Sequence, residues 1–422
     1  MWARADGFHY VWKKVEGGDV TLTADIAFTG TGKAAHRKGV LMIRQNLGAD
    51  GAYADAALHG DGLTSLQSRE ANGELTHEIQ ANTAAAPKRL RISKRGDRFY
   101  MSVSPDAGAE PRFTGGWMEA KLTAPFYVGI GVCSHDKDTV EKLVFTNVTL
   151  ETAPSMPVAK PVRYSTLETI AVASTDRRVT HVSRDLLQSP SYTRDGASLI
   201  FASQGRLVRI AAAGGGAPAA LGAVTGPHAL SPDGARIAFA GESKRLFAMP
   251  AAGGAATKIT AALKAPVQGL AWSPDGKMLL VSAGRNAGLY TLPAEGGGKP
   301  AKIGQGQDPA YSPDGQFIYF ASARSGGSRQ IWRMKADGAG AEQVTTDEME
   351  NWSPRISPDG RQMAFLSAEK GSAQPRMRIR TMLLLGDKTI RTLAKLAGGA
   401  PAWSPDSRRL TFVSYQELPP QE

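Results

Sequence analysis

Acidic side chains that could do chemistry recur at one position of a repeated five-residue turn. A ring of carboxylates would suit a metal ion or acid–base catalysis. In most copies, however, the aspartate stands in a Ser-Pro-Asp-Gly sequence, where its side chain accepts hydrogen bonds from its own turn. We therefore expect each carboxylate to be structural. The six are Asp195, Asp233, Asp275, Asp314, Asp359 and Asp406.

Motifs of covalent and metal catalysis are scarce. The chain contains no G-x-S-x-G, no H-E-x-x-H, no phosphate loop and no G-x-G-x-x-G after a predicted strand. Ser367 and Lys370 match S-x-x-K without its companion motifs, which a chance match explains. Cys133, the only cysteine, lies in an apolar run and is expected to be a buried small hydrophobe. The sequence predicts no metal and no other cofactor.

The spacing of the turns identifies the elements that carry them. Successive turn aspartates are 38, 42, 39, 45 and 47 residues apart, and repeats of about 40 residues indicate solenoids or propellers. Each repeat contains four short strands. In one copy the first strand ends at Tyr311, and the other three cover residues 318–322, 331–334 and 343–345. Four strands make one propeller blade.

The two ends of this region complete each other. The chain stops just after the second strand of the sixth repeat, at Phe412–Ser414. Residues 169–173 match the third-strand pattern and residues 179–182 match the fourth. We therefore predict a six-bladed propeller over residues 167–416, closed by strands from both ends of the segment, since closure hides exposed strand edges.

Residues 1–152 predict a separate β-sandwich. Apolar and other residues alternate in several short runs, with turn signals between them and no persuasive helical period. Residues 153–166 are proline-rich and predict a semi-rigid linker; residues 417–422 are a tail. The whole chain is therefore expected to be all-β. The runs cover 20–28, 39–45, 88–94, 98–103, 126–134 and 143–150.

The charge of the chain is uneven. Residues 1–152 hold 18 Lys/Arg and 18 Asp/Glu, whereas residues 153–422 hold 32 and 21, so the whole excess of +11 lies on the repeat region. A basic field favours anionic partners, although a solvated, soluble surface is the simpler interpretation. Nucleic-acid binding is disfavoured because no recognisable reading element accompanies the charge.

The repeats resemble those of the TolB-type six-bladed propeller over residues 165–415. The copies that carry the resemblance best are residues 272–282 and 311–322. The first copy departs from the pattern at Thr193-Arg194 and the last at Ser407. Residues 8–14, 39–44, 53–62 and 126–135 resemble concanavalin-like jelly-roll domains. The resemblance implies an extracytoplasmic binding protein, because TolB binds protein partners in the bacterial envelope.

A propeller of this kind predicts a binding funnel at its axis. Small residues are expected where inner strands crowd together, and the position before the motif's apolar residue is Ser191, Ala229, Ala271, Ala310, Arg355 and Ala402. Arg355 breaks this series and could clamp a carboxylate or phosphate, or else reach the funnel mouth as a solvated side chain. The predicted funnel residues are Arg355, His228, Gln268, Asp308, Asn351 and Trp352.

In the sandwich, aromatic and polar residues are candidate contacts for a glycan. Aromatic faces stack on sugar rings, and carboxylates bind hydroxyls. Core packing and turn formation account for the same residue types. The candidates are Trp12, Tyr10, Arg44, Asp55, His59, Asp61 and His135.

The preferred interpretation is a non-enzymatic periplasmic or secreted protein. Its propeller would bind a protein segment or an anionic ligand, and its sandwich a glycan. One rival is a glycan lyase or hydrolase using Asp308 and His228 in the funnel; another is a purely structural scaffold. No run approaches the ~18 apolar residues of a membrane span. The chain opens in mid-pattern without a signal-peptide core, so we expect residues upstream of Met1.

Overall fold

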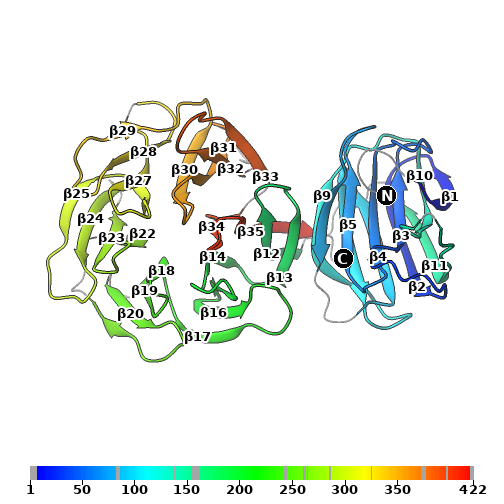
Figure 1. Ribbon diagram of the computed structural model, residues 1–422, viewed down its shortest axis with the longest axis horizontal. Helices are drawn as coiled ribbons and strands as arrows, with labels where there is room; N and C mark the ends of the chain where they lie inside the picture. The colour runs from blue at the N-terminus through cyan, green and yellow to red at the C-terminus, as the bar shows by residue number, and fades with distance from the viewer. Residues whose placement is uncertain are drawn as a thin grey trace. The chain divides into compact units, whose positions relative to one another are not determined.

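The computed structural model consists of β-strands joined by turns and forms two compact units (Figure 1). One unit comprises Met1–Tyr164, Thr175–Arg184 and Gln416–Glu422, and the other comprises Ser165–Ser174 and Asp185–Tyr415. The structure describes residues 7–81, 86–136, 138–153, 162–241, 245–259, 263, 265–284, 287–324, 326–371, 377–395 and 398–418. Most of the predicted linker lies outside these residues. None of them forms a helix long and apolar enough to cross a membrane.

The N-terminal unit contains two sheets. The first runs in the order β1 (His9–Val15), β10 (Phe126–Cys133), β3 (Lys38–Arg44), β4 (Tyr53–His59), β5 (Thr64–Arg69), β6 (His77–Ala81) and β13 (Arg177–Ser183). The second runs in the order β11 (Leu143–Ala153), β2 (Asp19–Phe28), β7 (Arg89–Arg95), β8 (Arg98–Ser104) and β9 (Arg112–Glu119). The six strands expected from alternation are present, and β1, β4, β5, β6 and β9 are additional.

A shared hydrophobic core holds these two sheets face to face. It includes Leu41 and Leu66 from the first sheet and Leu22 and Ile92 from the second, all at most 2% exposed. Val179 of β13 also belongs to this core, and β13 pairs in parallel with β6. The segment expected as the fourth strand of the last blade therefore groups with the N-terminal unit, because its apolar side chain is buried there.

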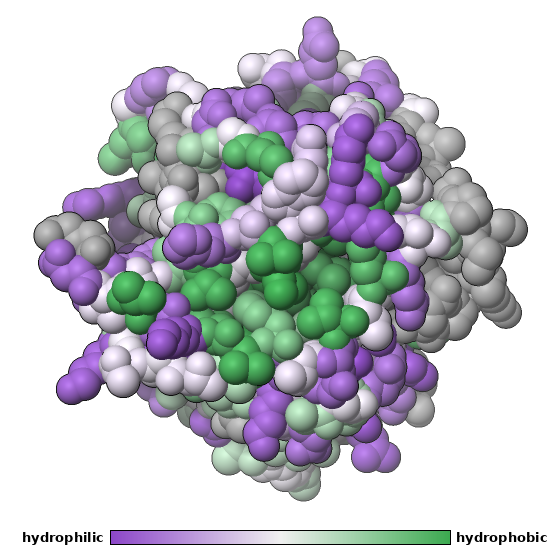
Figure 2. Space-filling model, turned by 90° about the vertical axis from the view of Figure 1, so that its right-hand side faces the viewer, coloured by the Kyte–Doolittle hydropathy of each residue, from purple (hydrophilic) through white to green (hydrophobic). Residues whose placement is uncertain are grey.

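One face of the N-terminal unit gathers apolar side chains within a polar rim (Figure 2). Most monomeric proteins expose large apolar side chains only singly. Seven in this unit are exposed, and five of them fall on β1, β11 or the loop before β11. These are Val11, Trp12, Val140, Val144 and Val148, with Leu47 and Leu75 elsewhere.

The C-terminal unit contains five antiparallel four-stranded sheets, each beginning with a short inner strand that ends at a motif turn. Their orders are β14 (Leu187–Tyr192), β15 (Ser198–Ser203), β16 (Arg206–Ala211), β17 (Ala219–Ala223); β18 (His228–Leu230), β19 (Arg236–Ala240), β20 (Leu246–Pro250), β21 (Thr257–Lys258); β22 (Val267–Trp272), β23 (Met278–Ala283), β24 (Gly288–Pro293), β25 (Ala301–Gln305); β26 (Gln307–Tyr311), β27 (Phe317–Ser322), β28 (Gln330–Lys335), β29 (Glu342–Gln343); and β30 (Glu350–Ile356), β31 (Gln362–Ala368), β32 (Arg378–Leu383), β33 (Ile390–Lys395).

The last motif turn joins β34 (Ala402–Trp403) to β35 (Arg409–Leu418), and β12 (Val162–Ala171) lies beside β35. The hydroxyls of Thr169 and Thr411 are 2.8 Å apart, and the N–H of Val172 donates to the carbonyl of Arg408 at 3.0 Å. Residues 169–171 thus belong to a strand beside β35, and Val172 continues the contact.

Each inner strand contacts the next, and β34 contacts both β30 and β14. The indole N–H of Trp403 donates to the carbonyl of Arg355 at 2.9 Å, and the hydroxyl of Thr411 donates to that of Tyr192 at 2.6 Å. A Cβ added to Gly196 would lie 3.5 Å from the Cδ of Pro405. The first and last motif turns are therefore in direct contact.

The motif turns use their aspartates locally, as the sequence predicted. Ser273 Oγ donates to Asp275 Oδ1 at 2.6 Å and accepts the N–H of Met278 at 2.9 Å, while Asp275 accepts the N–H of Lys277 at 3.1 Å. The same three bonds recur in the other five turns. In the last turn Ser407 takes the glycine position with φ of 60°.

These hydrogen bonds predict a pH dependence of stability. The serine or threonine hydroxyl, helped by a backbone N–H, lowers the pKa of each motif aspartate. As the pH falls below about 4, these aspartates therefore bind protons in the unfolded chain before they do so in the folded chain. The free energy of unfolding that they contribute above that pH is then lost. The triple variant Asp233→Asn/Asp275→Asn/Asp314→Asn should lose less unfolding free energy between pH 5 and pH 3 than the wild type, measured by urea denaturation.

A suitable control is Asp337→Asn. Asp337 lies in another turn and accepts a backbone N–H at 2.9 Å, but it belongs to no motif. Its profile should match the wild type. Parallel profiles for the triple variant and the wild type would contradict the explanation.

Candidate functional site

The inner strands of the C-terminal unit line a central cavity of about 630 Å³. All six residues at the position before the motif's apolar residue line it, five of them small and one Arg355. Small side chains let the strands approach one another, and Arg355 is the one long side chain at this position of the motif. Of the six residues predicted for the funnel, Arg355, His228, Gln268 and Asp308 line this cavity.

Three bulges direct polar side chains into the cavity. Strand pairing shifts register in β14, β26 and β30, where Ser189, Asp308 and Ser353 each precede a proline. Their φ angles are 50°, 48° and 51°, a left-handed conformation that costs of order 1 kcal/mol in a residue other than glycine. All three line the cavity. Bulges commonly re-aim a side chain next to a functional site.

Arg355 and Asp308 place opposite charges in this cavity. Ser353 Oγ donates to Asp308 Oδ2 at 2.9 Å, and Arg355 Nη1 donates to the carbonyl of Pro354 at 2.8 Å. Burial lowers the pKa of Arg355, and the negative charge of Asp308 opposes that shift. A guanidinium has five N–H donors, so most of those on Arg355 are open to a ligand.

His228 adds a neutral imidazole to the same cavity. Burial lowers the pKa of His228 to about 4, against a smaller opposite effect from the backbone of Ser189. Both ring nitrogens are buried, and neither has a hydrogen-bond partner among the described residues. Leaving a buried polar group unpaired costs about 1–3 kcal/mol. The imidazole therefore offers at least one unused hydrogen-bonding group at neutral pH.

Asn351 and Trp352 do not line the cavity, contrary to the prediction that placed them in the funnel. Asn351 is fully buried, and its amide donates to Gln330 at 2.9 Å and to Asp347 at 2.7 Å. Trp352 packs against a blade core beneath the guanidinium of Arg329, 4.9 Å from its ring centre. The bulge that follows Trp352 separates these two residues from the cavity-lining segment.

Three polar residues that line the cavity were not predicted, namely Ser189, Ser353 and Arg194. Ser353 could have been found because it occupies the same offset from its turn as Asp308, in an X-Pro pair. Arg194 takes the place of the motif proline in the first turn and lines the cavity together with the other five motif prolines. A second positive charge therefore lies among these turns.

Comparison with known proteins agrees with this architecture. Residues 271–397 match the family model described as the TolB beta propeller domain. An uncharacterised protein of Agrobacterium fabrum is 31% identical over 273 residues, which cover 60% of this chain and 92% of that protein. The chain belongs to the TolB-like β-propeller family.

One solved structure agrees with this assignment, and a second is a more distant match. A putative TolB from Agrobacterium tumefaciens has a TM-score of 0.53 and 29% identity, covering 60% of this chain and 99% of that one. TolB from Acinetobacter baumannii has a TM-score of 0.42 and 15% identity, covering 69% and 77%. Both Asp308 and Arg355 lie within the segment that matches the family model.

The glycan candidates in the N-terminal unit of the TolB-like chain fall into separate places. Tyr10, Arg44 and Asp55 lie close enough for both charges to affect the pKa of Tyr10, which burial raises. Arg44 is only 3% exposed and Asp55 is fully buried. Trp12 is 46% exposed and makes an edge contact with Tyr127, 4.9 Å between ring centres.

The remaining candidates surround a histidine cluster. His36 lies 6.0 Å from His59 and 6.3 Å from His135, measured between ring centres. His59 is buried, whereas His135 is exposed; Asp61 accepts the N–H of Leu63 at 3.0 Å and forms a turn. Burial and Lys38 lower the pKa of His59 to about 4.

A buried polar network beneath this cluster was not predicted. Lys38 Nζ donates to Gln67 Oε1 at 3.1 Å, and Gln67 Nε2 donates to Glu78 Oε1 at 2.8 Å. Burial would raise the pKa of Glu78, but hydrogen bonds from Gln80, Ser65 and Gln67 outweigh it, so the pKa is lowered. Gln67 links the two buried charges, and a glycan could reach only the exposed candidates directly.

The environment of His228 gives a direct prediction. Its imidazole should titrate with a midpoint near pH 4, measured by NMR and assigned with the variant His228→Gln. The unfolded chain binds this proton near pH 6.5, so stability should fall as the pH drops from 6.5 toward 4. His228→Gln should remove part of that loss. A midpoint near 6.5 would contradict a buried neutral imidazole.

Proposed function

We propose that this chain is a binding protein whose central cavity receives a segment of a partner protein. The observation that carries the proposal is Arg355, a half-buried guanidinium that lines the cavity among small residues and shares it with the imidazole of His228. A carboxylate fits the planar fork of an arginine. The segment therefore presents an acidic side chain or a chain terminus to Arg355.

The other polar groups favour a mixed ligand over a simple anion. Asp308 repels a second carboxylate and accepts donors such as an amide or hydroxyl. His228 supplies at least one hydrogen-bonding group without charge. A volume of about 630 Å³ lies within the 300–1,000 Å³ usual for ligand pockets, which is large enough for a few side chains.

The proposal includes a finer fold than family membership. We take the C-terminal unit to be a six-bladed ring closed where β12 joins β35, and the N-terminal unit to be a concanavalin-like jelly roll. We also place the protein outside the cytoplasm. The contact of Pro405 with Gly196 and the two-sheet core support the fold assignments.

A displayed library of random peptides would test the function. Peptides enriched on the full chain should contain a shared acidic residue, and Arg355→Ala should weaken their binding at least about tenfold, roughly 1.4 kcal/mol. Arg355→Lys should restore only part of the affinity, because an ammonium lacks the planar fork. Isothermal titration calorimetry of the enriched peptides measures both.

Arg206→Ala is the matched control, because Arg206 is exposed and does not line the cavity. It should leave affinity unchanged. Equal binding by the wild type and Arg355→Ala would refute the assigned role of the cavity. Turnover of a glycan that is lost in Asp308→Asn would favour the lyase or hydrolase alternative instead.

A further inference from the structure

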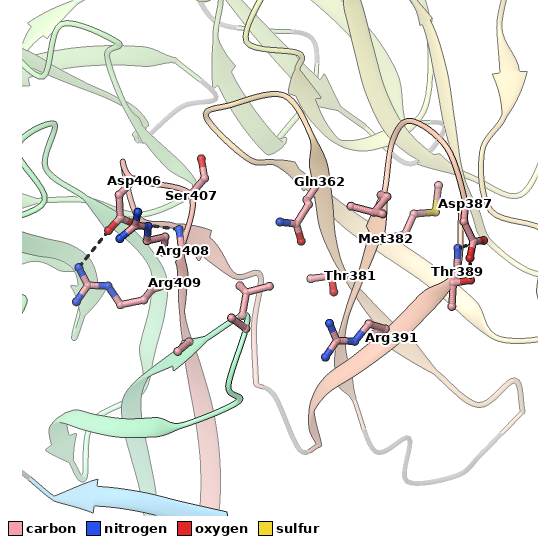
Figure 3. Close-up of a pocket in the computed structure, with 14 residues that line it drawn as sticks. Gln362, Thr381, Met382, Asp387, Thr389, Arg391, Asp406, Ser407, Arg408 and Arg409 are labelled. Carbon is pink, nitrogen blue, oxygen red and sulfur yellow. Dashed lines mark hydrogen bonds and ion pairs between the residues drawn. The ribbon is translucent and has the colours of Figure 1, made fainter.

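A second cavity, of about 800 Å³, lies elsewhere in the C-terminal unit and shares no residue with the central one (Figure 3). We call it the lateral groove. One wall comes from β31, β32 and β33. The opposite wall comes from the β34–β35 turn and the end of β12. Its labelled polar residues include Gln362, Thr381, Arg391, Asp406 and Arg408.

The first wall is the face of a sheet. Thr381 pairs with Arg391 on β33 and with Ala364 on β31, so the three side chains share one face. Ala364 packs in the core cluster that contains Val172 and Leu410. This face of the sheet therefore points toward β12 and β35. Arg391, which shares the face, points toward the opposite wall of the groove.

The one carboxylate of the opposite wall, that of Asp406, already has partners within that wall. Asp406 accepts the hydroxyl of Ser404 and the N–H of Arg408 at 3.1 Å, and forms a salt bridge with Arg409 at 3.5 Å. The side chain of Arg408 remains beside this pair in Figure 3. Arg409 thus forms the salt bridge on this wall, whereas Arg408 lies near Asp406 without one.

The other carboxylate of the groove is also engaged. Asp387 accepts the N–H of Thr389 at 3.1 Å and its hydroxyl at 2.7 Å. Three arginines face two aspartates, so the groove is net positive. Arg391 and Arg408 form no salt bridge with any carboxylate in the described part of the chain. They are available to an anionic partner.

The groove is apolar between and beside these charges. Val172 and Met382 lie in its lining at 8% and 3% exposure. Among the described residues of the C-terminal unit, the exposed large hydrophobics are Leu186, Leu383 and Leu385. Leu383 lines the groove, and Leu385 follows in the same turn. Exposed apolar surface with a polar rim commonly marks a protein-binding site.

We propose that the lateral groove binds an acidic segment of a partner protein. The segment lies across the groove with apolar side chains on the lining and carboxylates near Arg391 and Arg408. A single small anion fits less well, because the two guanidiniums come from opposite walls of the groove (Figure 3). The basic excess of residues 153–422 also favours an acidic partner.

The test uses the full chain and a fluorescein-labelled peptide of sequence EDELVLEDE. Fluorescence anisotropy should show binding that weakens as salt rises. A peptide with glutamine and asparagine in place of the acids should bind at least about tenfold more weakly. Hydrogen exchange of the wild-type chain should slow at residues 171–173 and 381–391 when the acidic peptide is bound.

Variants separate this groove from the central cavity. Arg391→Glu/Arg408→Glu should weaken binding of the acidic peptide at least about tenfold. Arg206→Glu/Arg245→Glu makes the same charge change at exposed positions outside both cavities and should have little effect. Arg355→Ala should leave this peptide unaffected, so failure here is distinguishable from failure of the central site.

Several outcomes would overturn the proposal. Equal weakening by both double variants would reduce the interaction to net charge. Exchange protection confined to the central cavity, or loss of binding in Arg355→Ala, would move the peptide to that site. The groove would be a simple anion site if millimolar inorganic phosphate displaced the peptide and if replacing the apolar residues of the peptide left its affinity unchanged.

Discussion

The C-terminal unit depends on the contact between one motif turn and the next. A Cβ added to Gly276 would lie 4.0 Å from Pro232, and one added to Gly315 would lie 3.7 Å from Pro274. In these turns the glycine lies against the proline of the turn before it, whereas Gly234 lies against Arg194. The hydrogen bonds of the motif serine or threonine and the motif aspartate fix the shape of each turn.

That constraint explains why the cavity can hold charges at all. Small residues such as Ala271 and Ala310 keep the strands close, and Arg355 alone among the six residues at this position extends a long side chain into the lining. Asp308 and Ser353 reach the interior only because their strands bulge, at a cost in backbone conformation. Strain of this kind persists where the surrounding structure holds it in place, here the pairing on either side of each bulge.

The sequence predicted the periodic features well and the local irregularities poorly. The role of the motif aspartates and the position of Arg355 followed from a pattern repeated six times. Asn351 and Trp352 were misplaced because a bulge changes which side of the strand faces the axis. Alternation alone does not reveal a bulge, although an X-Pro pair at a fixed offset from each turn gives a local signal.

Long-range pairing was the other limit. Residues 179–182 read as a strand, and they form one, but their pairing with β6 and the burial of Val179 depend on contacts about 100 residues away. The buried network of Lys38, Gln67 and Glu78 likewise joins three strands. Charged residues within strands look exposed in a sequence, because only the folded sheet shows that their partners lie directly across.

The two cavities of the TolB-like unit differ in the exposure and the pairing of their charged side chains. In the central cavity, Arg355 and Asp308 are half-buried in one lining, so recognition there depends on placing one group against each. In the lateral groove, the carboxylates are consumed by Arg409 and Thr389, which leaves Arg391 and Arg408 facing solvent. Exposed charges act over about 8–10 Å at physiological ionic strength and mainly increase association rates, whereas buried hydrogen-bonded charges mainly slow dissociation. A partner that engages both would be attracted by the groove and retained by the cavity.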